Sequence, residues 1–388
     1  MAGVPSAETL EPIYLDYNAS TPVAPEVFQE LLPFLQQHYG NPSSSHWASA
    51  SLKEKIELAR SRVAAALGAD SSEVIFTSGG TEANNHALKG VYFASRHRGC
   101  HIITTTIEHP AILTPCDFLR TLGAEVTYIR VDRRGRVSPE DVERAIRSDT
   151  ILISVMHANS EVGTIQPIEE ISRIAKKHGI LLHTDAAQSF GKIPVRVDSL
   201  GVDLLSIAGH KLYAPKGIGA LYVREGTEIA PFVHGAGHES GRRAGTENVP
   251  CLVGLGKAAE LAAERDDSPV LLVLREALRD GLHDVFGNRV RFNGDPELSL
   301  PNTLNVSFLG MNGQDILRQL PEIAASTGSA CHSGSTSLSP VLRAMGIGEY
   351  EGLGAIRLSL GRYTSMKEIE TVISLFQARL LGAGPLFS

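Results

Sequence analysis

The chain has 388 residues, of which 43% are hydrophobic and 20% are charged, and its formal net charge is −7. That length exceeds the size at which a single hydrophobic core usually stops growing, so we expect two domains. The acidic balance and the lack of basic blocks disfavour nucleic acid and membrane surfaces as partners, and no apolar run reaches the ~18 residues of a membrane-spanning helix.

The N-terminal residues and the cysteines bear on the compartment. Residues 1–8 lack the basic and apolar regions of a secretory signal, and no arginine precedes Arg60, which disfavours a mitochondrial presequence. The four cysteines are widely spaced and form no Cys-x-x-Cys pair. We therefore expect no metal site, no disulfide framework, and a reducing, cytoplasmic compartment.

Through the first two thirds of the chain, short apolar runs alternate with helical patterns. Several runs are apolar on both faces, as expected of strands in a sheet that helices cover. One helix signal is clear, because Ser138 can cap, Pro139 suits the first turn and acidic residues complement the helix dipole. The alternation predicts a mostly parallel α/β sheet. Its expected strands are 74–77, 101–105, 126–129, 151–156, 181–183, 204–207 and 220–223.

The pattern changes after about residue 263. The elements expected there are a charged helix near 271–285, strands at 304–308 and 356–360, and a final helix over 367–381. This arrangement is typical of a smaller α+β domain. We therefore predict a large domain over residues 20–262 and a small domain over residues 263–388. Residues 1–19 are expected to belong to the small domain.

Two of the apolar strands end in polar residues suited to pyridoxal phosphate (PLP). Asp185 and Gln188 follow one strand, and His210 and Lys211 follow the other. A lysine amine can form an imine with the cofactor, and a carboxylate keeps the pyridine nitrogen protonated so that the ring accepts electrons. Gln188 can donate to the phenolic oxygen of the ring. A helix-capping Asp185 and a solvated surface Lys211 are the competing interpretations.

Two other segments also suit such a cofactor. Residues 78–82 form a glycine-rich turn between a predicted strand and a predicted helix, where the backbone of Gly80 and the hydroxyl of Thr81 can approach a phosphate. A glycine-rich turn without a ligand is the competing interpretation. His109 follows the next strand and can stack on the ring and shuttle protons, or can simply cap a helix.

Cys331 is the candidate that defines the reaction. It lies within residues 326–339, which are rich in Ser, Gly and Thr and are expected to form a mobile surface loop. A thiol on such a loop can act as a travelling nucleophile once it is deprotonated, and the adjacent His332 either assists or is solvated. Arg357 alternates with apolar residues on a predicted strand and can grip a substrate carboxylate or form a structural ion pair.

Together these segments resemble the cysteine desulfurase and selenocysteine lyase family, the class V branch of fold-type I PLP-dependent enzymes. The resemblance extends from Tyr14 to Arg362. It depends on motifs in the family's order, at residues 14–22, 40–44, 77–82, 108–109, 185–188, 209–211, 242–248 and 328–332. The resemblance implies a large, mostly parallel sheet domain and a smaller C-terminal α+β domain that carries the catalytic cysteine loop.

The resemblance also implies a role for each matching residue. The cofactor-binding residues would be Lys211 as the Schiff-base lysine, Asp185 on the pyridinium nitrogen, Gln188 on the phenolic oxygen, His109 stacked on the ring, and Gly80, Thr81 and His210 at the phosphate. Arg357 and Asn41 would bind the substrate carboxylate, and Cys331 would be the nucleophile. Thr246 would reach the phosphate of the neighbouring subunit, which implies a homodimer with shared sites.

The chain departs from the family's pattern at two positions. Many desulfurases have a serine two residues before the histidine of Gly-His-Lys, where this chain has Ala208, which puts one phosphate hydrogen bond in doubt. Many also have Asn-Asn-Glu where this chain has Asn159, Ser160 and Glu161. Ser160 is too short to replace an asparagine at the cofactor, and Asn159 can substitute for it.

The implied activity is a PLP-dependent cysteine desulfurase. Lys211 would remove the α-proton of L-cysteine, and Cys331 would take the sulfur as a persulfide, release L-alanine and pass the sulfur to an acceptor protein or thiol. Residues 330–333 and Ala208 also fit a selenocysteine lyase, whereas the spacing from Cys331 to Arg343 favours a desulfurase. An aminotransferase or β-lyase that does not use Cys331 is the other alternative, and the intact Lys211, Asp185 and Cys331 disfavour a non-enzymatic sulfur-trafficking scaffold.

Overall fold

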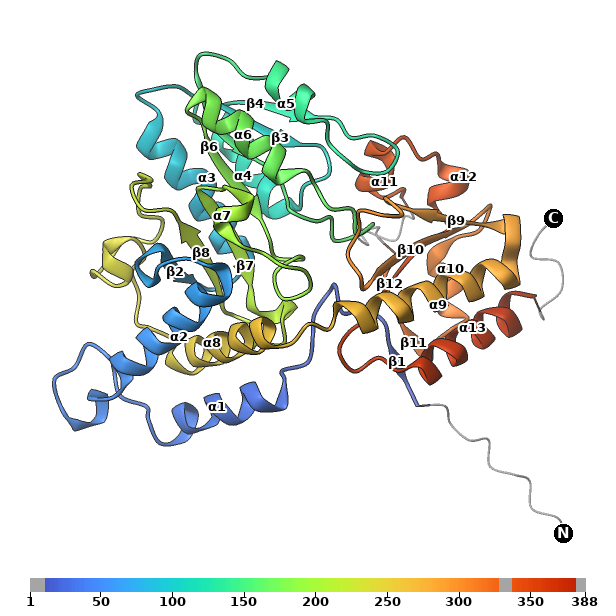
Figure 1. Cartoon of the computed structure of the whole chain (residues 1–388), viewed down its shortest axis with the longest axis horizontal. Helices are drawn as coiled ribbons and strands as arrows, with labels where there is room; N and C mark the ends of the chain where they lie inside the picture. Colours follow the sequence, from blue (N-terminus) through green and yellow to red (C-terminus); the bar gives the residue numbers. More distant parts are fainter. Residues whose placement is uncertain (1–10, 328–336, 382–388) are drawn as a thin grey trace, which may run out of the picture.

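The computed structural model describes residues 11–327 and 337–381 (Figure 1). The helices among these residues are too short or too polar to cross a membrane. Figure 1 shows two layered parts, one built around the larger sheet and one around the smaller, with the N-terminal segment running between them.

A seven-stranded sheet organises the first part, in the order β2-β8-β7-β6-β5-β3-β4. Its strands are β2 (Val74–Thr77), β3 (His101–Thr105), β4 (Glu125–Ile129), β5 (Thr150–Ser154), β6 (Leu181–Asp185), β7 (Leu204–Ala208) and β8 (Gly219–Val223). Strands β4, β3, β5, β6 and β7 run parallel, whereas β8 pairs antiparallel with both β7 and β2. The expected mostly parallel α/β sheet is confirmed, with one antiparallel strand that the sequence did not indicate.

Helices cover both faces of this sheet because successive strand residues point to opposite sides. Ile102 and Ile103, for example, belong to different buried clusters, as do Leu204 and Leu205. One face packs against α3 (Gly80–Ser95) and α4 (Pro110–Arg120). The buried cluster on the other face includes residues of α1 (Pro25–Gln36), α2 (Leu52–Leu67), α5 (Pro139–Arg144), α6 (Ile168–His178), α7 (Val197–Leu200) and α8 (Val249–Glu264). The hydroxyl of Ser138 accepts from the backbone N–H of Asp141 at the start of α5, as its sequence predicts.

The second part contains a three-stranded antiparallel sheet, β12-β10-β9. Its strands are β9 (Val290–Asn293), β10 (Thr303–Phe308) and β12 (Ala355–Ser359), and β1 (Ile13–Tyr14) pairs in parallel with β11 (Ile323–Ala324) nearby. The helices α9 (Ser268–Phe286) and α13 (Met366–Leu381) lie against each other and share a buried cluster with β1, β10 and β12. Three short helices complete this part, namely α10 (Gly313–Arg318), α11 (Pro340–Ala344) and α12 (Glu349–Gly352).

The buried residues change cluster at the end of α8. Leu261 belongs to the core of the large sheet, whereas Leu271 belongs to the core that includes Ile13 and Leu15. We propose on this basis the domain boundary at residues 262 and 263, with residues 1–19 assigned to the small domain, although residues 1–10 lie outside the described residues. Domain boundaries usually fall in exposed linkers that few contacts cross.

Candidate active site

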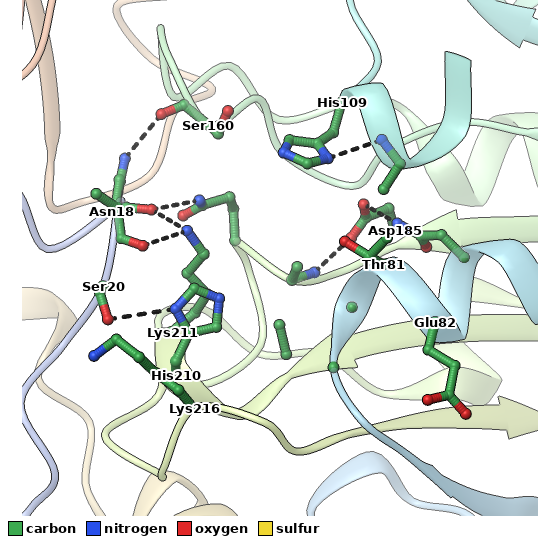
Figure 2. Close-up of a pocket in the computed structure, with 18 of the residues that line it drawn as sticks. Asn18, Ser20, Thr81, Glu82, His109, Ser160, Asp185, His210, Lys211 and Lys216 are labelled. Carbon is green, nitrogen blue, oxygen red and sulfur yellow. Dashed lines mark hydrogen bonds between the residues drawn. The ribbon is translucent and has the colours of Figure 1, made fainter. Parts of the chain in front are cut away.

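A cavity of about 610 Å³ lies where the carboxyl ends of β6 and β7 meet the start of α3 and the N-terminal segment (Figure 2). Ligands of α/β sheets bind at this edge, outside the carboxyl ends of the parallel strands. Seven of the sequence-predicted residues line the cavity together with Arg357 from β12, namely Gly80, Thr81, His109, Asp185, Gln188, His210 and Lys211. The structure therefore brings together segments that are up to about 280 residues apart in the chain.

Asp185 ends β6 and is only 8% exposed. Its Oδ2 accepts a hydrogen bond of 2.7 Å from Asn84 Nδ2, and its Oδ1 accepts one of 2.9 Å from the backbone N–H of Ala187. No ion pair joins this carboxylate to another side chain among the residues that the structure describes. A buried carboxylate without a cation is costly, so Asp185 is suited to a positively charged ring nitrogen of a ligand.

Lys211 ends a short 3₁₀ turn (Gly209–Lys211) directly after β7. Its Nζ donates to the backbone carbonyl of Asn18 and, at 2.9 Å, to that of Ala19 (Figure 2). Burial, reinforced by the nearby Arg357, lowers the pKa of Lys211 to about 8, although Asp16 and Asp185 oppose this shift. A larger share of the amine is therefore uncharged at neutral pH than for a solvated lysine, which favours nucleophilic and basic chemistry.

His109 combines the two roles that its sequence left open. It is the N-cap of α4, and its Nδ1 accepts a hydrogen bond of 3.0 Å from the backbone N–H of Ala111. The same residue lines the cavity. Because Nδ1 is the acceptor, the proton of the neutral ring is on Nε2. The helix start thus fixes both the tautomer and the place of the imidazole.

The turn before α3 lines the cavity and is suited to an anion. Gly79 has a φ of 146°, which side chains of L-residues rarely permit, and the helix begins at Gly80. A Cβ at Gly80 would lie only 3.2 Å from the Cβ of Ala208, so the glycine allows the close approach of this turn to β7. Backbone N–H groups at such a helix start attract phosphate. Burial lowers the pKa of the neighbouring His210 to about 4, so its ring acts as a neutral hydrogen-bonding group.

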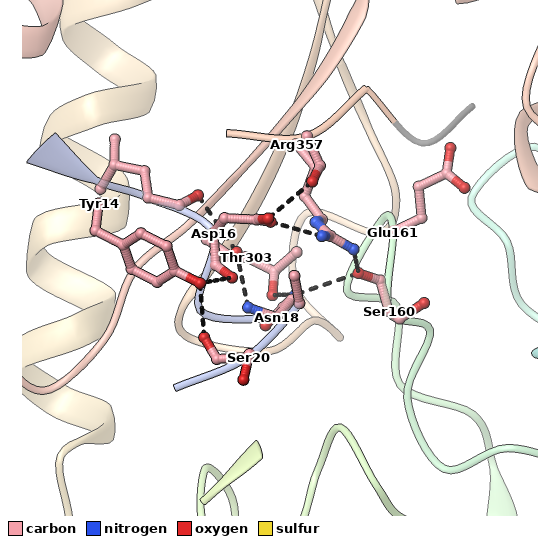
Figure 3. A network of polar contacts seen from close by, with 12 residues as sticks. Tyr14, Asp16, Asn18, Ser20, Ser160, Glu161, Thr303 and Arg357 are labelled. Carbon is pink, nitrogen blue, oxygen red and sulfur yellow. Dashed lines mark hydrogen bonds and ion pairs between the residues drawn. The ribbon is translucent and has the colours of Figure 1, made fainter. Parts of the chain in front are cut away.

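Arg357 points from β12 towards the cavity and is already paired (Figure 3). Its Nη2 lies 2.7 Å from Asp16 Oδ1, and its Nη1 donates to the backbone carbonyl of Ser160 at 2.9 Å. Asp16 Oδ2 accepts in turn from Ser326 Oγ at 2.9 Å. Arg357 Nε is buried and has no hydrogen-bond partner among the described residues. The two sequence-based alternatives therefore coexist, because the guanidinium forms a structural ion pair and also lines the cavity.

Known proteins share this architecture. The family model described as Aminotransferase class-V matches residues 13–372. The cysteine desulfurase IscS of Dictyoglomus turgidum is 49% identical, with 94% of this chain and 93% of that protein covered. The chain belongs to the cysteine desulfurases of the class-V aminotransferase family. Two solved structures are also similar to this desulfurase. A NifS-like protein is 39% identical with a TM-score of 0.89, and the match covers 96% of this chain and 100% of that one. The structure described as "SspA in complex with cysteine" is 40% identical with a TM-score of 0.79, and the match covers 91% of this chain and 100% of that one.

Some residues predicted for the site of this desulfurase do not line the cavity. Asn159 is buried beside it, with Oδ1 accepting from the backbone N–H groups of Glu161 and Val162, and it is Ser160 that lines the cavity. Asn41 and Thr246 are exposed and do not line it. Cys331 and the rest of its predicted motif, from residue 328 onward, lie outside the described residues.

The structure also shows a residue of this desulfurase that sequence reasoning missed. Asn18 is 1% exposed, and its backbone carbonyl accepts from Lys211 Nζ and, at 2.9 Å, from Gln188 Nε2. Its Nδ2 donates to Thr303 Oγ1 at 2.8 Å in the small sheet. The motif at residues 14–22 was the available signal, but nothing in the sequence showed which of its groups contact the site.

The other cysteines of this desulfurase are poor nucleophiles. Burial raises the pKa of the Cys116 thiol to about 12 and also raises the pKa values of Cys100 and Cys251. A thiol with a raised pKa carries little thiolate at neutral pH. In the described part of the chain, no group of three or more His, Cys, Asp or Glu residues could hold a metal ion.

Glu108 is a buried acid behind the site of this desulfurase. Burial raises its pKa to about 8, and Asp185 adds to the shift, against the hydrogen bonds from Met156 N and Thr105 Oγ1. The carboxyl is thus neutral in the folded chain up to about pH 8, whereas its ordinary pKa is 4.5. The stability that this shift contributes is fully present below pH 4.5 and is lost as the pH rises to about 8.

We expect Glu108→Gln to remove this pH dependence. Between pH 5 and pH 8 the wild-type free energy of unfolding should fall by about 2–4 kcal/mol more than that of the variant, because an amide has no proton to lose. Urea unfolding of both proteins at the two pH values measures this difference. Parallel curves for the two proteins would show that Glu108 is ionised in the folded state at neutral pH.

Proposed function

We propose that this chain is a PLP-dependent cysteine desulfurase, which converts L-cysteine to L-alanine and forms a persulfide on Cys331 for transfer to a sulfur acceptor. Its family is PLP-dependent. The observation that carries the proposal is the placement of Lys211 and Asp185 in one cavity, where the amine has a lowered pKa and the carboxylate forms no ion pair with any side chain that the structure describes. A relative's structure contains cysteine, which supports this substrate class.

The residues of the cavity fit PLP. Asp185 would pair with the pyridine nitrogen, Gln188 would donate to the phenolic oxygen, and Lys211 would carry the aldehyde carbon. The turn at Gly80 and Thr81 would hold the phosphate together with His210, at the helix start where backbone N–H groups gather. When bound, PLP supplies an electron sink for charge that develops on the α-carbon of the substrate.

Three side chains of this protein would bind the substrate and move its protons. Arg357 would bind the substrate carboxylate, through a guanidinium that Asp16 and the Ser160 carbonyl already orient. Lys211 would act as general base towards the α-proton, for which a pKa of about 8 is well matched to neutral pH. His109, with its proton on Nε2, would hold or move a proton at that atom.

Cys331 would carry out the sulfur transfer. Its thiolate attacks the substrate sulfur, an S–S bond forms as the Cβ–S bond breaks, and the electron pair stays with the carbon fragment. Protonation of that fragment gives L-alanine, and the sulfur remains on Cys331 as a persulfide. The step needs no oxidant, because the carbon fragment is reduced as the sulfur is oxidised. A thiol or protein thiolate then removes the outer sulfur.

The proposal includes a homodimer in the cytoplasm. Thr246 is exposed, and the segment before it is fastened to α3 by an ion pair of 2.8 Å between Arg243 Nε and Glu82 Oε1. This would let Thr246 reach the phosphate bound in a neighbouring subunit. Tyr39 and Trp47 are 74% and 83% exposed, and aromatic side chains of this size are typical of surfaces that a second subunit covers.

Parallel rates with L-cysteine and L-selenocysteine test the proposal. The purified protein should contain PLP and, in a single turnover without an acceptor thiol, form L-alanine and protein-bound persulfide in equal amounts from L-cysteine. Much faster turnover of L-selenocysteine with little cysteine activity would make it a selenocysteine lyase. Alanine without persulfide, or a second half-reaction with a keto acid, would indicate a β-lyase or an aminotransferase. A colourless protein that takes up no PLP would refute all three.

Arg357→Lys should raise KM for L-cysteine about 10- to 100-fold and change kcat less. Lysine keeps the charge beside Asp16 but loses the planar pair of donors that a carboxylate needs. Steady-state kinetics give both constants, and thermal unfolding shows whether the ion pair with Asp16 persists. An unchanged KM in a stably folded variant would remove Arg357 from the substrate site.

A further inference from the structure

Lys192 is a second lysine close to Lys211, and it lies behind the cavity. It does not line the cavity, but its Nζ reaches two side-chain oxygens, Gln188 Oε1 at 2.8 Å and Asn18 Oδ1 at 2.9 Å. A lysine amine that faces carbonyl oxygens acts as a donor. Burial lowers the pKa of Lys192, as do Lys211 and Arg357. Because even an uncharged amine has two N–H groups, Lys192 can donate to both oxygens in either protonation state.

These contacts distinguish the two ends of the Gln188 amide. Its Oε1 faces Lys192, and its Nε2 donates to the backbone carbonyl of Asn18 at 2.9 Å. The flipped amide would place N–H groups against the amine of Lys192 and a carbonyl against the carbonyl of Asn18. Both contacts would be unfavourable, so Lys192 and Asn18 select one orientation. Gln188 is 7% exposed and lines the cavity, and its nitrogen has a second N–H to offer there.

The second acceptor of Lys192 is itself fixed. Asn18 Nδ2 donates to Thr303 Oγ1 (Figure 3). Asn18 Oδ1 also accepts from Asn302 Nδ2 at 3.1 Å. The Asn18 amide therefore cannot flip without breaking bonds to both residues of the small domain. Lys192 is consequently held against a rigid acceptor, and this determines where its Nζ lies relative to Gln188.

We propose that Lys192 is a positioning residue, which fixes the Gln188 amide with its nitrogen towards the cavity so that Gln188 donates a hydrogen bond to the ring oxygen of PLP. The inference rests on the proposed function. Without Lys192, only the Asn18 carbonyl still selects this orientation, so the amide can rotate more readily and present its oxygen to the cavity. That oxygen is an acceptor and cannot bond to the ring oxygen, which is an acceptor too. Lys192 thus holds the Gln188 amide in the orientation in which its nitrogen, a donor, faces the cavity.

The visible absorbance of the PLP-loaded protein reports this hydrogen bond directly. A donor on the ring oxygen stabilises negative charge there, so it favours the deprotonated chromophore and lowers the pKa at which the absorbance changes. Lys192→Met should therefore raise this pKa by about one unit, the size expected for a hydrogen bond to a charged group. The measurement is a spectrophotometric pH titration of the loaded protein without substrate.

A double-mutant cycle separates positioning from a direct effect of charge. If Lys192 acts through Gln188, Lys192→Met should shift the pKa in the wild type but not in a Gln188→Leu background. An equal shift in both backgrounds would overturn the proposal, because it would show that Lys192 acts by its charge alone. No shift in the wild type would overturn it too. Lys192→Gln is titrated in parallel and provides the readout if the Met variant does not fold.

Lys89→Met is the matched control. Lys89 is also half-buried with a lowered pKa, but its Nζ lies 4.6 Å from the ring centre of Phe118, away from the cavity. It should titrate like the wild type, and a shift in this variant equal to that of Lys192→Met would count against a specific role. Wild-type protein that binds no PLP would refute the proposed function, whereas loaded variants that titrate like the wild type refute only the role of Lys192.

Discussion

Alanine in place of Lys211 should lower the rate of alanine formation from L-cysteine at least about 10³-fold and leave the protein without covalently attached PLP. Two losses combine in this variant, since the same amine would anchor the cofactor and remove the α-proton. The site makes the amine suitable for both tasks. Burial and Arg357 lower its pKa to about 8, and the carbonyls of Asn18 and Ala19 hold its Nζ at the cavity.

Borohydride reduction of the wild type, followed by peptide mass analysis, should find the pyridoxyl group on Lys211. Lys192 is the alternative attachment site to check, because burial lowers the pKa of its amine as well. Label on Lys192 would reassign the anchor. Lys89→Ala serves as the control for loss of a half-buried lysine and should keep its colour and activity. A Lys211→Ala protein that still forms alanine at the wild-type rate would contradict the assignment.

The sequence predicted the strands well because burial on both faces leaves a simple pattern. Each strand of the large sheet was found within a few residues of its expected bounds, and the polar residues after β6 and β7 meet at one edge because parallel strands share their carboxyl ends. Strand β9 was missed. Its short run with an arginine does not give a strong apolar signal, and its pairing with β10 decides its conformation.

The part of the site that sequence did not reveal depends on contacts across long separations. Asn18 meets Gln188 and Lys211 across 170 and 193 residues of sequence, and no local pattern records such a contact. Asn159 has a different, local reason: its Oδ1 accepts from the backbone N–H groups of Glu161 and Val162, while Ser160 lines the cavity. Motif spacing shows which residues are near each other in the chain, whereas backbone geometry decides which of them faces the ligand.

The ion pair of Arg357 links the substrate site to the segment that precedes Cys331. Asp16 bonds Arg357 through one oxygen and Ser326 through the other, and Ser326 also exchanges backbone hydrogen bonds with Arg357. A substrate carboxylate at Arg357 would have to share a guanidinium that Asp16 partly neutralises. Binding of substrate there would therefore act on a bond network that includes Ser326, five residues before Cys331.

Cys331→Ala should retain PLP and its absorbance change on addition of L-cysteine, but form protein-bound persulfide at less than about a hundredth of the wild-type rate. The cofactor-binding residues named above do not include Cys331, so binding should not depend on the thiol. The sulfur step should depend on it, because no described cysteine can replace it. Burial raises the pKa of Cys116 to about 12 and raises those of Cys100 and Cys251 as well.

Mass analysis of the intact protein after one turnover, without added thiol, detects the extra sulfur atom. Cys251→Ala is the matched control, because it removes a half-buried thiol outside the cavity and should leave persulfide formation unchanged. Full persulfide formation by Cys331→Ala would show that another group accepts the sulfur. If the Cys331→Ala protein instead lost PLP as well, the thiol would have a structural role in the cofactor site, and the separation of cofactor binding from sulfur transfer would be wrong.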